Sequence, residues 1–181
     1  MIAEKQPQKQ RSKTTKIIFA IIAAAVIAGV IFLIETPWFF NMEYETSNEK
    51  DYRKCLRLVN DLPGVTEVFP EEIPANAKDV AFNAYNNIGG RSLKLSFAAE
   101  DTAIKAYIQK AEANALCFGT KNDSHVAQAL PSHKLSSLND EALVFVLDSE
   151  PYRANNFNHA KLVWIVVNEK TKSITFAADS Y

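Results

Sequence analysis

The chain has 181 residues, 20 basic residues, 21 acidic residues and two cysteines. This length fits one folded domain with additional segments. Residues 1–16 hold five of the basic residues and only one acid. Residues 17–181 therefore carry a net charge of about −5, which argues against binding to nucleic acid or to an anionic membrane surface.

Residues 17–34 form an apolar run, IIFAIIAAAVIAGVIFLI, without a charged or strongly polar side chain. A helix of this length extends about 27 Å, close to the roughly 30 Å hydrocarbon core of a bilayer. A buried core helix is a second interpretation, but such helices usually have a polar face. A cleavable signal peptide is a third, although the small residues that cleavage requires lie in the middle of the run. No cysteine comes directly after the run, which argues against a lipoprotein anchor. We therefore predict a retained transmembrane helix.

The charges around this run predict its orientation. Basic residues precede it and Glu35 follows it, so the positive-inside rule places residues 1–16 in the cytoplasm. We expect residues 35–46 to be a membrane-proximal linker and residues 47–181 to fold in the periplasm or outside the cell. The protein would then be a single-pass protein of the inner or plasma membrane, held by a signal anchor.

The first part of the outer domain has the patterns of a helix and a hairpin. Apolar residues at helical spacing predict a helix over residues 49–62, which Pro63-Gly64 would end. Two alternating runs follow, with apolar residues at Val80, Phe82 and Ala84 and then at Leu93, Leu95 and Phe97. The glycine-containing segment between the two runs predicts a β-hairpin.

The second part has one more helix and three strands. A helix is predicted over residues 101–116, stopped by Gly119, and strands are predicted over residues 142–147, 162–167 and 173–178. The first two of these strands are almost wholly apolar, which is typical of central strands covered on both faces. The order α-β-β-α-β-β-β predicts an α+β domain with a mainly antiparallel sheet and helices packed on it.

Residues 69–77, FPEEIPANA, precede the predicted hairpin, and residues 174–178 have the sequence ITFAA. An F-P-x-x-I-P segment before a hairpin, together with a late I-x-F-x-A strand, resembles an uncharacterised family of small bacterial exported or membrane-anchored proteins. This resemblance implies an envelope location. It implies no activity, cofactor or site residue.

Cys55 and Cys117 both lie in the predicted outer domain. An oxidising compartment favours pairing of the two thiols, and they would meet if the two predicted helices packed side by side. The chain-entropy model credits a disulfide closing a loop of this length with roughly 4 kcal/mol. Two separate buried thiols are the alternative.

The three histidines, His125, His133 and His159, lie in predicted loops, and their spacing matches no metal-binding motif. A Ser-His-Asp set can be drawn from Asp123, Ser124 and His125, but adjacency in sequence is not the geometry of a catalytic triad. The chain has five glycines and no phosphate-loop motif. We therefore expect no catalytic residue, no metal site and no cofactor.

The connection between the two apolar strands, residues 149–159, contains Tyr152, Arg153 and Phe157 among several asparagines. Tyrosine and arginine are favoured at protein contact surfaces, where they contribute area and hydrogen bonds. We predict that these three side chains contact a partner. An ordinary long hairpin loop is the alternative.

These features favour a non-enzymatic, membrane-tethered domain that binds another envelope protein, in an accessory or immunity role. Its partners would be the bilayer, through residues 17–34, and that envelope protein, with no nucleic acid. Two alternatives stay open. One is an envelope hydrolase whose site is built from scattered loop residues, and the other is a sensor domain that binds a small ligand or lipid.

Overall fold

The computed structural model describes the chain except for residues 1–7, 36–41, 47–48, 88, 150–160 and 181. The chain divides into two compact units, Met1–Phe39 and Phe40–Tyr181. The second unit is a mixed α+β domain with an antiparallel sheet, which confirms this coarser part of the fold predicted from the sequence.

The first unit contains one long helix, α1 (Gln8–Glu35). The side chains described within it, over residues 15–31, are exposed. Among the residues that the structure describes, no helix combines the length and the apolarity needed to cross a membrane. The transmembrane role of residues 17–34 therefore stays a prediction.

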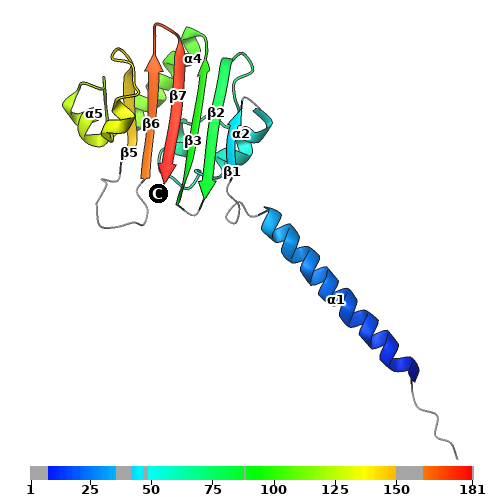
Figure 1. Cartoon of the computed structure of the whole chain (residues 1–181). Helices are drawn as coiled ribbons and strands as arrows, with labels where there is room; N and C mark the ends of the chain where they lie inside the picture. The colour runs from blue at the N-terminus through cyan, green and yellow to red at the C-terminus, as the bar shows by residue number, and fades with distance from the viewer. Residues whose placement is uncertain (1–7, 36–41, 47–48, 88, 150–160, 181) are drawn as a thin grey trace, which may run out of the picture. The chain divides into compact units, whose positions relative to one another are not determined.

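The second unit is built on a seven-stranded sheet in which all neighbouring strands are antiparallel (Figure 1). The strand order is β1-β2-β3-β7-β6-β5-β4, so the last strand of the chain lies at the centre of the sheet. The strands are β1 (Met42–Thr46), β2 (Lys78–Asn87), β3 (Gly90–Ala98), β4 (Cys117–Gly119), β5 (Leu143–Ser149), β6 (Lys161–Asn168) and β7 (Ser173–Ser180).

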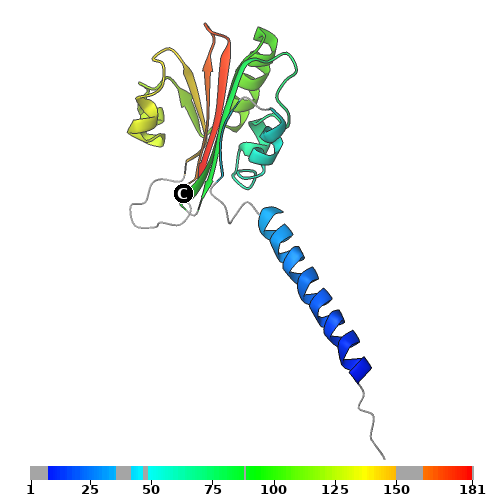
Figure 2. The same cartoon turned by 45° about the vertical axis from the view of Figure 1, so that its right-hand side comes forward.

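The first face of the sheet is covered by α2 (Glu49–Leu56), α3 (Val65–Val68) and α4 (Asp101–Asn114). Alternate strand residues point toward these helices, and side chains such as Leu95 and Phe176 are fully buried beneath them. Figure 2 shows the sheet nearly edge-on with these helices on one side. The period-2 pattern of the predicted hairpin therefore corresponds to burial on this face.

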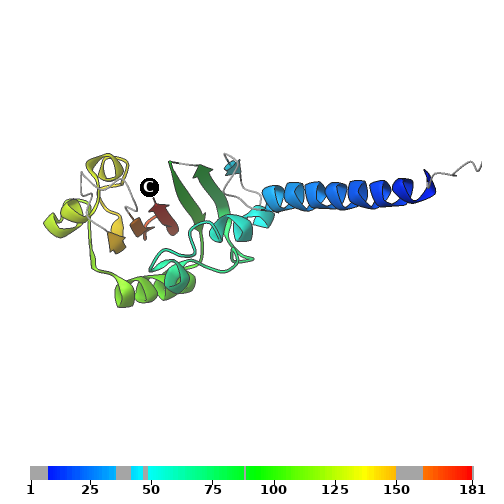
Figure 3. The same cartoon turned by 90° about the horizontal axis from the view of Figure 1, so that it is seen from below.

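The second face is covered only in part. The short helices α5 (Ser124–Ala129) and α6 (Ser132–Leu135) pack over the end of the sheet formed by β4, β5 and β6. A second apolar cluster lies beneath them and includes Val126 and Trp164. Among the described elements, no helix covers this face over β2 and β3 (Figure 3).

The half-covered sheet accounts for the different compositions of its strands. Phe145 and Ile165 belong to the apolar cluster on the first face, and Val144 and Trp164 belong to the cluster on the second. Strands β5 and β6 therefore have apolar residues at successive positions because both of their faces are buried. This confirms the sequence prediction for these two strands.

The predicted helices are shorter in the structure. The first helix ends at Leu56 rather than Leu62. The chain continues there as turns, in which N–H groups such as that of Leu58 bond a carbonyl three residues back, here that of Cys55. The second ends at Asn114, and Gly119, predicted to stop it, lies in strand β4.

Five of the described elements were missed. Strand β1 lies inside the stretch predicted to be a linker, residues 35–46, and pairs with β2. Strand β4 and the helices α3, α5 and α6 have at most six residues each, too short for a clear hydrophobic period. The predicted order α-β-β-α-β-β-β therefore lacked both edge strands of the sheet.

Candidate functional site

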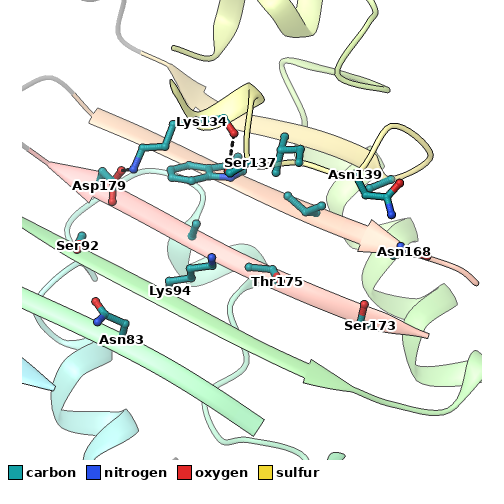
Figure 4. A pocket seen from close by; sticks show the side chains of 15 residues that line it. Asn83, Ser92, Lys94, Lys134, Ser137, Asn139, Asn168, Ser173, Thr175 and Asp179 are labelled. Carbon is teal, nitrogen blue, oxygen red and sulfur yellow. Dashed lines mark hydrogen bonds and ion pairs between the residues drawn. The ribbon is translucent and has the colours of Figure 1, made fainter. Parts of the chain in front are cut away.

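The uncovered half of the second face forms a groove of about 490 Å³, which we call the sheet groove (Figure 4). It lies between α6 on one side and β2 on the other. Most of the lining side chains are polar. They are Asn83, Ser92, Lys94, Lys134, Ser137, Leu138, Asn139, Ala142, Trp164, Val166, Asn168, Ser173, Thr175, Ala177 and Asp179.

Strand pairing explains how these side chains come together. Asn83 pairs with Lys94, Lys94 pairs with Ala177, and Ala177 pairs with Trp164. These four residues form one row across β2, β3, β7 and β6, and in antiparallel sheets such opposite residues share a face. Because Ala177 has a small side chain, the row is low between Lys94 and Trp164.

An ion pair closes one side of the sheet groove. Lys134 Nζ lies 2.7 Å from Asp179 Oδ2 and 5.1 Å from the centre of the Trp164 ring. Asp179 is only 3 % exposed, so the lysine compensates a carboxylate that is nearly buried. The ammonium group also lies over an aromatic face, which is favourable for a cation.

Lys94 differs from Lys134 because its side chain is exposed. No ion-pair partner for Lys94 occurs in the described part of the chain, and Figure 4 shows its side chain standing in the groove beside Thr175. An exposed, uncompensated ammonium group is available to an incoming anion. Lys94 is therefore the residue of the groove best placed to attract a ligand.

A smaller hollow of about 350 Å³ continues the groove toward the β2–β3 turn. It shares Ser92, Lys134 and Asp179 with the sheet groove, and its further lining is Tyr85, Asn87, Gly89, Gly90 and Arg91. The Asn87 side-chain amide donates to the Tyr85 hydroxyl, and the Gly89 N–H donates to Asn87 Oδ1 over 2.7 Å. These bonds stabilise the turn at this end of the groove.

Arg91 joins this turn to the helices on the first face. Its guanidinium donates to both carboxylate oxygens of Asp61, at 3.0 Å each, and to the Leu58 carbonyl at 2.7 Å. The hydrogen bond from Arg91 lowers the pKa of Asp61 below its usual value. These hydrogen bonds of Arg91 connect the β2–β3 turn to the chain that follows α2.

The cysteines do not form the predicted disulfide, and both are free thiols. Cys55 is buried in the apolar cluster on the first face, whereas Cys117 packs against the cluster on the second face. The sheet therefore separates them, because Cys117 lies on β4 and not on a helix beside α2. Burial raises the pKa of Cys55 to about 11 and also raises that of Cys117.

The sequence analysis rejected a triad of Asp123, Ser124 and His125, and in the structure Asp123 and His125 make local hydrogen bonds. His125 Nε2 lies 2.9 Å from the Phe118 carbonyl oxygen, and Asp123 accepts hydrogen bonds from the Thr120 N–H and hydroxyl. The bond from the Thr120 N–H lowers the pKa of Asp123. His133 lies in α6. Within the described residues, no group of three potential ligands could hold a metal ion.

Four residues singled out from the sequence, Tyr152, Arg153, Phe157 and His159, lie outside the described residues. The contact role of Tyr152, Arg153 and Phe157 therefore stays a prediction.

The sequence analysis missed the sheet groove. A usable signal was the row of small polar residues at alternate positions of two strands, Ser92 and Ser96 in β3 and Ser173 and Thr175 in β7. Such alternation indicates a strand with one solvated face. No local signal pointed to Lys134, because its position depends on how α6 packs on the sheet.

Comparison with protein-family models, with curated proteins and with solved structures finds no match to this chain.

Proposed function

We propose that this chain is a membrane-tethered domain that binds another protein of the cell envelope. Residues 17–34 would form the anchor, residues 1–16 would lie in the cytoplasm, and the sheet domain would lie in the periplasm or outside the cell. In this proposal the sheet groove is the binding surface, and the chain acts as an accessory or immunity-type protein.

The apolar surface of α1 supports the anchor. Residues 17–34 contain no charged side chain, and large apolar side chains along the helix are exposed, including Phe19 at 68 % and Ile21 at 63 %. Exposure of apolar surface to water costs about 25 cal/mol per Å², a cost that lipid would remove. The structure describes the side chains of α1 over residues 15–31 only, so the last three residues of the proposed span 17–34 lie beyond them.

The half-covered sheet is the observation that carries the binding role. Three helices cover the first face, whereas α5 and α6 cover only one end of the second. The remaining area is a groove lined by hydroxyl, amide and amine groups. Concave surfaces with several convergent polar groups are the usual place for binding sites in proteins.

The two alternative functions have less support. A hydrolase would need a histidine beside an acid or a serine in a cleft, and no histidine of the described residues lines the sheet groove or the hollow that continues it. A lipid sensor would need an apolar pocket between the sheet and its helices, whereas most side chains that line the groove are polar. A protein ligand therefore fits this surface better.

Site-specific photo-crosslinking tests the proposal. A benzophenone amino acid would replace Thr175, which lines the groove, in the full-length chain in its native membranes. Lys105, which is exposed on α4 against the other face, is the matched control position. We expect a discrete crosslinked species of higher mass from position 175 and none from position 105. Equal labelling at both positions, or none at position 175, would reject the groove as the binding surface.

A further inference from the structure

We propose that the sheet groove binds an extended acidic segment of its partner protein. This inference rests on the proposed function and adds the chemistry and the shape of the ligand. It is carried by the charges of the lining, the row of residues around Lys94 and the length of the groove along β7.

The charge accessible to a ligand is basic. Among the described residues, the charged ones that line the sheet groove and the hollow that continues it are Lys94, Lys134, Arg91 and Asp179. Lys134 is paired with the nearly buried Asp179, and the Arg91 guanidinium is paired with Asp61. The charge that remains for a ligand is the exposed ammonium group of Lys94. The chain as a whole has more acids than bases, so the groove departs locally from the charge of the protein. Such a departure favours an acidic partner.

The row through Lys94 provides a place for a carboxylate. Asn83 is the cross-strand partner of Lys94 on one side, and the small Ala177 is its partner on the other. Ser92 and Thr175 line the same groove. A carboxylate beside the exposed Lys94 would accept a charge-assisted hydrogen bond from its ammonium and further bonds from the amide and hydroxyl groups around it.

The groove is long enough for an extended peptide. Its lining includes Asp179 near one end of β7 and Ser173 at the other. The two residues are six positions apart along the strand, roughly 20 Å at 3.3 Å per residue. An extended ligand segment of about six or seven residues spans the same distance.

The aromatic content of the groove argues against a stacked sugar or base. Trp164 is only 7 % exposed, and the Lys134 ammonium lies over its ring. Ligands that bind by stacking need an open aromatic face. Apart from Asp179, the polar side chains of the lining can donate hydrogen bonds or carry positive charge, which suits carboxylates and peptide carbonyls.

Fluorescence anisotropy of the full-length chain in phosphatidylcholine nanodiscs tests this inference. The probes are fluorescein-labelled peptides of seven glutamates and of seven serines, each at 50 and 300 mM NaCl. We expect the glutamate peptide to bind more tightly, and K94E to weaken it at least about tenfold at low salt. K105E makes the same charge change on α4 and should alter the affinity less than about twofold. The five basic residues of segment 1–16 give the same background in every variant.

Two results would overturn the inference. One is equal binding of the glutamate peptide by K94E and the unchanged chain, and the other is an equal loss in K94E and K105E. If position 175 still captures a partner when either result is found, the acidic ligand is rejected and the proposed function stands. If position 175 captures nothing, the proposed function is rejected as well.

Discussion

Lys134 and Asp179 join the short helix α6 to the central strand of the sheet, with Nζ and Oδ2 2.7 Å apart. The lysine side chain passes over the Trp164 ring, so a single residue fixes the helix, covers the indole and compensates the carboxylate. Because α6 forms one wall of the groove, the shape of the groove depends on this ion pair.

We expect Lys134→Ala to destabilise the domain by about 2 kcal/mol. The substitution leaves a nearly buried carboxylate without its cation and exposes part of Trp164. Differential scanning fluorimetry of the full chain in detergent should show a melting temperature lower by roughly 5 °C. Lys170→Ala removes an exposed ion pair with Glu141 and should have little effect. An equal fall in melting temperature in Lys134→Ala and Lys170→Ala would show that the Lys134 ion pair contributes no more than an exposed one.

We expect Arg91→Met to destabilise the domain by about 1–2 kcal/mol at neutral pH, because three hydrogen bonds to Asp61 and Leu58 are lost. The Arg91 bond lowers the pKa of Asp61 in the folded state. The ionised carboxylate therefore stabilises the fold above its unfolded pKa, and this stabilisation is lost as the pH falls through the lowered value.

Urea unfolding of both forms between pH 7 and pH 3 measures this dependence. The stability gap between the unchanged chain and Arg91→Met should narrow with acidification but not vanish, since the bond to the Leu58 carbonyl does not titrate. Arg53→Met removes an exposed pair with Glu72 and provides the control. A gap independent of pH would contradict the role assigned to Asp61.

The cysteines should remain free thiols even in an oxidising compartment, because they pack on opposite faces of the sheet. Cys117 is half-buried, whereas Cys55 is fully buried and its pKa is raised to about 11. Iodoacetamide should therefore modify Cys117 before Cys55 in the native protein, and both at similar rates in denaturant. Intact-mass analysis separates these outcomes. A native mass lower by two hydrogens would demonstrate a disulfide instead.

The hydrophobic pattern of the sequence was sufficient to predict the inner strands of the sheet but not its two edge strands. Leu95 follows the alternation of a strand buried on one face, as the burial pattern of β3 shows, and the near-continuous apolar runs of β5 and β6 follow from burial on both. Strand β4 has three residues, and its place beside β5 depends on long-range pairing. The error about Cys117 has the same origin, since a helix extended to Leu116 placed the thiol on the wrong element.

The groove could be predicted only in part for a related reason. The alternating polar residues around Lys94 indicate a solvated strand face. That Trp164 is covered while Lys94 is not depends on where α6 packs. Short helices without a strong apolar period give no such information before the fold is known.

A lysine in the middle of the proposed anchor should release the chain from the membrane. A charged side chain at the centre of a transmembrane helix costs about 2.5–3.5 kcal/mol on insertion scales. We expect the full chain to stay in the pellet after alkaline carbonate extraction, and a variant combining Ile22→Lys with Ile27→Lys to appear largely in the supernatant. Ile22→Leu with Ile27→Leu keeps the apolar surface and should stay in the pellet. If the unchanged chain is itself extracted, α1 is not a membrane anchor.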